Sequence, residues 1–173
     1  MEVISSQVCK FELLHLLAER SVDSNLTKAG IPYRLRTKRV SRLFLSGVQG
    51  YDYGGIIQYL ENFKGLLSNE GIECKILEDH DGVFKDIYKI AGVISRHILL
   101  GTTDIYVYAS AILAESDELI TYDIELRNVS KNLKESEDEF WKRIRGKLLK
   151  DLKETLPRFM DSSKIVLPAG KQI

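Results

Sequence analysis

The stretch GTTDIYVYASAILAESDELITYD, residues 101–123, decides the fold class that the sequence predicts. Its opening glycine and two threonines are typical of a helix end followed by a hydroxyl-capped helix start. Residues 105–114 are apolar on nearly every side and rich in alanine, which predicts a helix buried against a sheet. After an acidic turn, residues 119–122 predict a short strand. The stretch therefore predicts one acid, Asp104, at the start of a helix and another, Asp123, at the end of a strand.

The positions of these two acids carry information beyond local structure. Helical and strand-like segments, among them a strand expected over residues 73–77 after Gly71, alternate between residues 56 and 123. This order implies a parallel sheet. Ligands of open parallel sheets bind outside the carboxyl ends of the strands, where Asp123 is expected. Each acid also has a structural explanation, because Asp104 would interact favourably with the helix dipole and Asp123 would be a common turn former. Both explanations stay open for each acid, whereas the combined pattern is more specific.

The combined pattern resembles the second half of a PIN domain, a family of metal-dependent ribonucleases. That family shows an Asp opening a helix of small and apolar residues, then a strand of the form Leu-hydrophobic-Thr-x-Asp, here residues 119–123. Residues 3–4 could form a very short strand, and a helix is expected over residues 7–20. The resemblance continues here, because Ile-Ser-Ser at residues 4–6 precedes this helix, which contains Glu12 and then a leucine. It covers residues 2–132 and implies an α/β fold with three layers around a parallel central sheet.

The resemblance also implies a metal site. In the family, acids converge at the carboxyl edge of the sheet and hold Mg²⁺ or Mn²⁺, and the matching residues here are Glu12, Asp104 and Asp123. Thr121 matches a hydroxyl that lies near the site. Carboxylates suit these hard cations, which activate water and stabilise charge on a leaving oxygen. The implied activity is endoribonucleolytic cleavage of RNA. The resemblance also implies that the protein could be the toxin of a toxin–antitoxin pair, with the antitoxin as its protein partner.

One family motif does not precede Glu12 in this sequence. The first strand of the family ends in Asp-Thr/Ser-Asn, whose Asp is the central metal ligand, and only Asp23-Ser24-Asn25 looks similar. That tripeptide follows the Glu12 helix and no strand precedes it, so we expect Asp23 to be a turn or capping residue. Either the sequence lacks an N-terminal strand, or the domain is divergent with an incomplete site. The second alternative predicts a domain that binds RNA or a protein partner without cleaving it.

Two further groups of residues have both a functional and a structural interpretation. Glu12 lies either at the metal site or on the solvated side of its amphipathic helix. The basic residues of positions 34–42 either contact RNA phosphates or form a solvated surface. These basic residues are Arg34, Arg36, Lys38, Arg39 and Arg42.

Residues 133–173 are expected to form a helical extension of the domain at residues 1–132. A charged helix is predicted over residues 136–160, with its end or a kink at Pro157, and residues 164–167 could form a final edge strand. The helix carries an apolar stripe, which must pack on the domain or on a second copy of the chain in a homodimer. The stripe consists of Trp141, Ile144, Leu148 and Leu152.

Composition limits the classes of protein to consider. Hydrophobic residues make up 44% and charged residues 29%, which is ordinary for a soluble globular protein that buries a core. The formal net charge is zero, so any surface for nucleic acid must be a local patch. The sequence shows neither a membrane span nor a signal peptide, so we expect a cytoplasmic protein without a membrane partner. Cys9 and Cys74 are then expected to be reduced, buried thiols.

Overall fold

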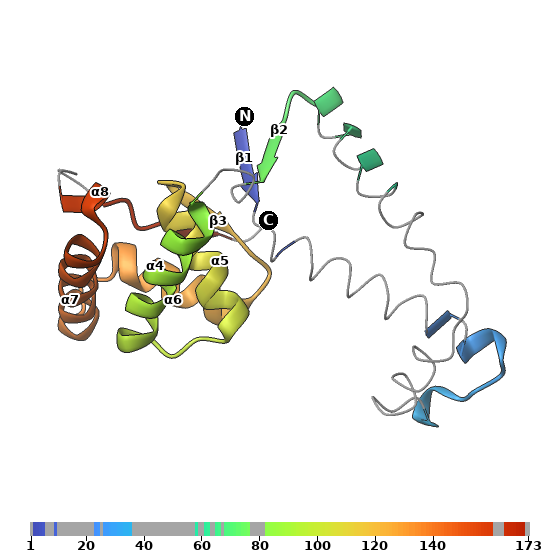
Figure 1. Cartoon of the computed structure of the whole chain (residues 1–173). Coiled ribbons are helices and arrows are strands. Elements are labelled where there is room, and N and C mark those ends of the chain that lie inside the picture. The colour runs from blue at the N-terminus through green and yellow to red at the C-terminus, as the bar shows by residue number, and fades with distance from the viewer. Residues whose placement is uncertain are drawn as a thin grey trace. The chain divides into compact units, whose positions relative to one another are not determined.

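A computed structural model describes residues 2–5, 9, 23–24, 26–35, 58, 61–62, 65–66, 68–76, 82–160 and 165–171 (Figure 1). The chain divides into two compact units. The N-terminal unit comprises Met1–Val3 and Cys9–Lys75, and the C-terminal unit comprises Ile4–Val8 and Ile76–Ile173. The predicted helix over residues 7–20, with Glu12, lies outside the described residues apart from Cys9, which is helical.

The short strands predicted near the N-terminus and after Gly71 are both present. They are β1, Glu2–Ser5, and β2, Glu73–Ile76, which are neighbours in a two-stranded sheet. A 3-10 helix, η1, spans Tyr33–Leu35. Asp23 lies in a short helical segment, where its carbonyl oxygen accepts a hydrogen bond of 2.8 Å from the Thr27 hydroxyl. Asp23 is therefore part of a helical turn, whereas residues 10–22, which precede it, lie outside the described residues.

The C-terminal unit consists mostly of helices with a small parallel sheet. Its elements are α4 (Val83–His97), α5 (Thr102–Leu113), β3 (Glu118–Ile120), α6 (Ile124–Glu135), α7 (Glu139–Thr155), α8 (Pro157–Met160) and β4 (Ala169–Lys171). Strands β3 and β4 run parallel, with Leu119 opposite Gly170. The prediction of mixed helix and strand with parallel pairing is thus confirmed for the described residues.

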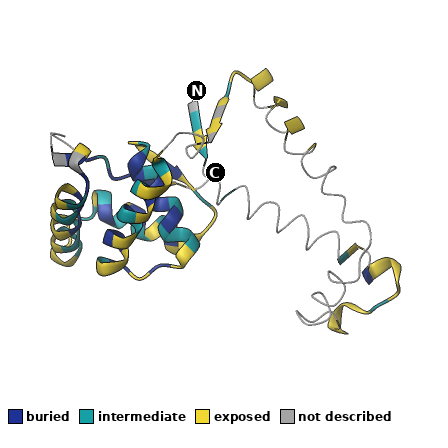
Figure 2. Ribbon diagram, viewed as in Figure 1, coloured by how far each residue is buried: buried dark blue, intermediate teal, exposed yellow. Residues whose placement is uncertain are grey.

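The core of the C-terminal unit lies where α5 and α7 pack on α4 (Figure 2). Helix α4 buries one face, with Ile87, Ile90 and Ile94 at the spacing of successive turns. Helix α5 is buried on most of its surface, as its composition predicts, and Tyr108 on it is fully buried. Burial raises the pKa of the Tyr108 hydroxyl above its ordinary value of 10.0, so this group stays protonated. Helix α5 is therefore a fixed support for the strand that follows it.

The predicted single helix over residues 136–160 is two helices in the structure. Helix α7 begins at Asp138, whose Oδ1 accepts a hydrogen bond of 2.9 Å from the Phe140 amide. It ends before Leu156, which has extended backbone angles (φ −121°, ψ 115°). The residue before a proline is disfavoured in helical conformation, and Pro157 then opens α8. The end or kink that the sequence predicts at Pro157 is therefore present.

The apolar stripe of α7 is covered, as predicted, and the covering comes from within the chain. Leu148 and Leu152 are fully buried, while Trp141 and Ile144 are partly buried against the core. A polar contact joins the same two helices, because His97 Nε2 of α4 lies 2.8 Å from Asp151 Oδ2 of α7. Helix α7 is thus packed on α4 by both apolar and polar contacts.

The final strand lies further along the chain than the sequence predicts. Residues 165–167 are largely buried but are not in a strand, and β4 begins at Ala169. Pro168 has no amide hydrogen to donate, so the hydrogen-bonded pairing starts only after it. The first bond of this pairing runs from the Ala169 amide to the Asp117 carbonyl at 3.0 Å. The prediction of an edge strand at residues 164–167 is corrected accordingly.

A glycine on β4 allows α6 to approach the sheet closely. A Cβ atom added at Gly170 would lie 2.7 Å from Arg127 Cα, a distance that real Cβ contacts do not show. The atoms it would meet belong to the backbone, which cannot rotate away as a side chain can. Gly170 therefore fixes the distance between α6 and β4, and with it the position of the β3–α6 turn.

Candidate functional site

Asp123 lies where β3 ends and α6 begins, as the sequence predicts. Its side chain caps α6, because Oδ1 accepts a hydrogen bond of 2.7 Å from the Leu126 amide. Its carbonyl oxygen accepts another from the Arg127 amide at 3.0 Å. Asp123 therefore has a structural role, as the cap of α6 and not as the turn former that the sequence predicts. Within the described residues, Oδ2 of the exposed Asp123 side chain accepts no hydrogen bond, which leaves half of the carboxylate available to a ligand.

Thr121 holds the backbone of Asp123 in place. The Thr121 Oγ1 atom accepts a hydrogen bond of 3.1 Å from the Asp123 amide. The Thr121 amide in turn donates to the Lys171 carbonyl of β4 at 3.1 Å. Thr121 thus links the end of β3 to β4 on one side and to Asp123 on the other. Its hydroxyl acts on the Asp123 backbone, which is a positioning role of the kind that the family resemblance implies.

Asp104 lies in the first turn of α5 and is half-buried. The N-cap residue is Gly101, and no side chain caps this helix end. The expected hydroxyl cap was wrong, because Thr102 and Thr103 already lie inside the helix. A Cβ added at Gly101 would lie 2.8 Å from Asp104 Oδ2, so the Asp104 carboxylate lies directly over this glycine. A negative charge is stabilised at this end of a helix by the backbone dipole.

The turn between α5 and β3 is tight. Helix α5 ends with Glu115 in the left-handed region (φ 54°), while the Ser116 amide donates to the Ala111 carbonyl at 3.0 Å. This six-to-one bond with a left-handed residue is a common way to end a helix. Helix α5 then packs against both β3 and α6. The two elements that carry Asp104 and Asp123 are therefore in contact.

The structure tests only part of the predicted metal site. Among residues 82–160 and the other described positions, no group of three or more His, Cys, Asp or Glu side chains could hold a metal ion. Glu12 lies outside the described residues, so a site built from all three predicted acids stays a prediction. The two acids that are described are oxygen ligands, which fits Mg²⁺ and Mn²⁺ better than softer metals.

The predicted basic cluster is described at one position only. Arg34 lies in η1 and is exposed. Arg36, Lys38, Arg39 and Arg42 lie outside the described residues. The interpretation of this cluster as an RNA contact therefore also stays a prediction.

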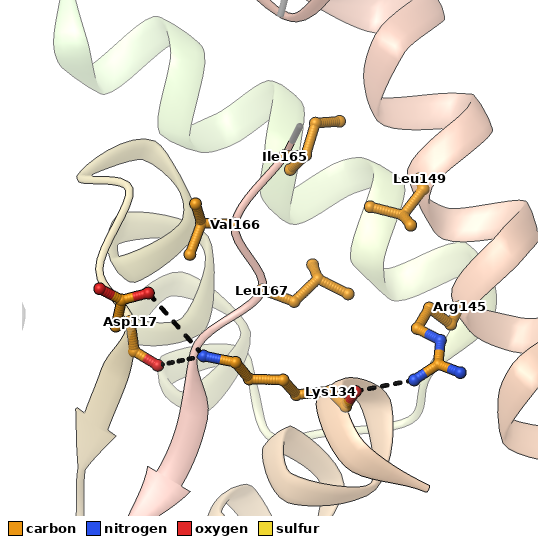
Figure 3. A pocket seen from close by; sticks show the side chains of 7 residues that line it. All are labelled: Asp117, Lys134, Arg145, Leu149, Ile165, Val166 and Leu167. Carbon is orange, nitrogen blue, oxygen red and sulfur yellow. Dashed lines mark hydrogen bonds and ion pairs between the residues drawn. The ribbon is translucent and has the colours of Figure 1, made fainter. Parts of the chain in front are cut away.

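Sequence analysis gave no role to a pocket at the opposite end of β3 (Figure 3). The pocket has a volume of about 200 Å³, and Leu149, Ile165 and Leu167 contribute its apolar lining. On its rim, Lys134 Nζ donates to the Asp117 carbonyl at 2.7 Å, and Arg145 Nη1 donates to the Lys134 carbonyl at 2.7 Å. Arg145 also reaches the Leu133 and Ser136 carbonyls, so it caps the end of α6 from α7. A basic residue in the last turn of α6 is visible in the sequence, but the partnership with α7 is not.

Sequence analysis also missed three exposed apolar side chains around Asp123. The exposed fractions are 53% for Ile120, 73% for Tyr122 and 64% for Ile124. Leu119, by contrast, is 8% exposed and faces the core. Apolar side chains that alternate with Thr121 and Asp123 in this way were the available signal. Within the part of the chain that the structure describes, these side chains are exposed before and after the predicted functional acid in the sequence.

Comparisons with known proteins leave the family open. No protein-family model matches this chain, and neither a curated protein nor a solved structure matches it. Among the helices that the structure describes, none is both long and apolar enough to cross a membrane.

Proposed function

We propose that this protein is a metal-dependent endoribonuclease that hydrolyses RNA phosphodiester bonds, with Glu12, Asp104 and Asp123 as the ligands of its metal ion. The observation that carries the proposal is the placement of Asp123. It follows a parallel strand at its carboxyl end, where ligands of such sheets bind. Its backbone is held by Thr121, and one carboxylate oxygen is not used by the cap.

The geometry of α5 supports Asp104 as a second ligand. At 1.5 Å per residue, α5 rises about 17 Å from its first residue to its last. Extended chain covers about the same length in the five steps from Glu118 to Asp123. Because the tight turn at Glu115 reverses the chain and α5 packs on β3, the start of α5 is expected at the same end as Asp123.

The chemistry of these residues suits phosphodiester hydrolysis. A bound Mg²⁺ or Mn²⁺ would polarise the attacking water and neutralise charge on the leaving oxygen. The carboxylates of Asp104 and Asp123 would hold the cation, and Thr121 would keep Asp123 in position. Water adds to phosphorus as one P–O ester bond breaks, which leaves a phosphate monoester and a hydroxyl. In the absence of a cation, neighbouring carboxylates would repel an RNA phosphate.

The proposal includes the finer features of the family that the sequence resembles. These are a three-layer fold around a parallel central sheet, a cytoplasmic location and the role of a toxin controlled by an antitoxin. A second candidate is a domain that binds RNA or a protein partner without cleaving it. The capping role of Asp123 favours this candidate, because the acid has a structural function even when no metal is bound.

Single-residue variants of the full chain test the proposal. Labelled single-stranded RNA is incubated with wild type, Asp104→Asn, Asp123→Asn and Asp117→Asn in Mg²⁺, Mn²⁺ or EDTA. Asparagine caps helices as well as aspartate does, so Asp123→Asn removes the charge and keeps the fold. The matched control is Asp117, an exposed acid just before β3.

We expect metal-dependent cleavage that falls about 100-fold or more in Asp104→Asn and Asp123→Asn. Asp117→Asn should cleave as wild type does. Cleavage that survives both substitutions, or that persists in EDTA, would overturn the site. Salt-sensitive RNA binding without cleavage in any metal would select the second candidate.

A further inference from the structure

The side of α4 that faces away from the core combines aromatic, basic and small residues. Its exposed residues include two of each kind and no acid, and they are Phe84, Lys85, Tyr88, Gly92, Ser95 and Arg96. At about 100° of rotation per residue, these positions fall within about one third of the helix circumference. They therefore form one continuous surface, which we call the α4 face.

The aromatic residues of the α4 face are supported from below but not covered. Tyr88 is 66% exposed, and its ring meets that of Tyr106 edge-on, with the ring centroids 5.8 Å apart. Phe84, one turn earlier, is 46% exposed. Beside them, no described atom lies within 4 Å of a Cβ added at Gly92. A glycine inside a helix is less favourable than alanine, and no contact in the described residues requires it here. Gly92 leaves a low point on the face where a partner can approach closely.

A second exposed surface of the chain has the opposite charge. Residues 135–140, which connect α6 to α7 and begin α7, read Glu-Ser-Glu-Asp-Glu-Phe. All four acids are exposed, and the side chains of Glu137 and Glu139 are 86% and 92% exposed. Phe140 is 52% exposed, and its ring contacts that of Trp141 edge-on, with the centroids 5.5 Å apart. We call residues 135–140 the acidic turn.

We infer that the α4 face binds the acidic turn of a second copy of this chain. Both surfaces have an exposed aromatic ring beside charged side chains, and the charges are opposite in sign. Protein interfaces have aromatic residues at the centre and a polar rim, and complementary charges at the rim steer the two partners together.

The charges needed for this contact are available on both surfaces. Among the described residues, neither Lys85 nor Arg96 has a carboxylate partner. On the acidic turn, Lys142 pairs with Glu137 and Glu139, at 2.9 and 3.6 Å. Because this one lysine faces four acids, the turn keeps a net negative charge.

This contact differs from a homodimer built on the apolar stripe of α7, which is covered within the chain. The two surfaces are unlike, so one copy contributes its α4 face and the other its acidic turn. A contact of this kind either occurs twice around a two-fold axis or continues from copy to copy. It does not depend on the proposed nuclease activity, because neither surface contains a predicted metal ligand.

Exchange of charge between the two surfaces tests the contact. The full-length chain is studied by sedimentation equilibrium, in low and high salt, at concentrations from about 1 to 500 µM. The double variant Lys85→Glu/Arg96→Glu makes the α4 face acidic. The double variant Glu137→Lys/Glu139→Lys makes the turn basic and keeps Asp138, which caps α7.

We expect wild type to self-associate in low salt with a dissociation constant of about 10–100 µM, as suits a small, charged interface. High salt should weaken this association. Each double variant alone should bind itself about 100-fold more weakly than wild type does, because like charges then face each other. An equimolar mixture of the two variants should associate within about fivefold of the wild-type affinity, because opposite charges face each other again.

Two matched controls lie on α7, outside both surfaces. Lys147→Glu/Lys150→Glu reverses two exposed lysines and should associate as wild type does. Gly92→Gln places a long uncharged side chain on the α4 face and should weaken association about 10-fold. Gly146→Gln makes the same change at an exposed glycine of α7 with equally open surroundings, and it should have no effect on association.

A wild-type chain that stays monomeric at the highest concentration in low salt would overturn the inference. A mixture that fails to associate, although both variants unfold at the wild-type temperature, would also reject it, because charge pairing would not be the cause. Equal weakening by Lys147→Glu/Lys150→Glu would show a general effect of charge and count against the two surfaces. Association restored only in the mixture supports the contact, since misfolding of either variant cannot produce it.

Discussion

At the start of β3, the basic side chains of Lys134 and Arg145 are bound to backbone carbonyls, whereas at its end Asp123 keeps one carboxylate oxygen outside the cap. The apolar residues at the two ends of β3 also differ, in how far they are buried. Ile165 and Leu167 are buried beside the first end, and Ile120 and Tyr122 are exposed at the second. The comparison shows how one short strand can have a structural end and an end with groups available to a ligand. Charged residues alone do not distinguish the two ends, but their hydrogen bonds do.

The largest effect is expected from a change that separates α6 from the sheet. Gly170→Ala places a Cβ within 2.7 Å of Arg127 Cα, so the helix backbone must move. We expect a loss of about 2–3 kcal/mol in the free energy of unfolding, measured by urea denaturation. Gly146→Ala, at an exposed position of α7, is the control, because nothing lies within 4 Å of its added Cβ. The control should gain about 0.5–1 kcal/mol, and equal stability of the two variants would contradict the close contact.

A smaller effect is expected at the start of β3. Arg145→Met keeps the apolar stem of the side chain but removes its hydrogen bonds to the carbonyls that end α6. We expect a loss of about 1–2 kcal/mol in unfolding free energy. Arg143→Met, at an exposed position of the same helix, should change it by less than about 0.5 kcal/mol. If both arginines proved equally dispensable, the structural role assigned to this end of β3 would be wrong.

At the end of β3, two substitutions of one residue separate its structural function from its charge. Asp123→Ala removes the cap of α6 and should cost about 1 kcal/mol, while Asp123→Asn should cost only a few tenths. The control at the other end of β3 is Asp117→Ala. Its side chain is 89% exposed and 4.0 Å from Lys134, so we expect no measurable change. Chemical denaturation distinguishes these outcomes, and a large cost for Asp117→Ala would remove the difference between the two ends.

The smallest effect concerns the pH dependence of an exposed ion pair near Arg145. The hydrogen bond from Lys142 lowers the pKa of Glu137 below its ordinary value, and Glu137 raises that of Lys142. Because the pKa of Glu137 is lower in the folded state, the pair stabilises the fold at pH values above the pKa of the unfolded state. This contribution is lost as the pH falls through the pKa of the folded state. Because the pKa of Lys142 is higher in the folded state, its contribution to stability is present below the pKa of the unfolded state. It is lost as the pH rises through the pKa of the folded state. An NMR titration should show a lowered pKa for Glu137 and a raised pKa for Lys142. Glu137→Gln should leave the unfolding free energy almost unchanged, because solvent screens the pair.

The sequence predicted the elements that depend on neighbouring residues. The helix before Glu115 follows from local patterns and is present, and the strand predicted over residues 119–122 is present as Glu118–Ile120, with Asp123 after it. The break of the charged helix at Pro157 was predicted as well. An error occurred at Pro168, after which the final strand begins. This error was avoidable, since the missing amide of proline is a local effect as well.

Other features of the site could not be predicted, because they depend on residues far apart in the chain. Arg145 reaches the end of α6 only because α7 packs beside it. The need for glycine at position 170 comes from the Arg127 backbone on another element. The exposure of Tyr122 likewise depends on what the remainder of the unit covers. Periodicity gives the faces of an element, whereas the contacts between elements decide which charged groups stay available.

The pairing of β3 with β4 has a consequence for synthesis on the ribosome. Glu118 pairs with Ala169, and the β3–α6 turn is held through the Lys171 carbonyl. Helices α4 to α7 therefore emerge before the strand that fixes Asp123 has been made. A nascent chain can form helical contacts during translation, but the turn with its acid and its tyrosine is assembled only after residue 171 has left the exit tunnel. The β3–α6 turn is thus completed later than the helices that support it, although its own residues precede α6 and α7 in the sequence.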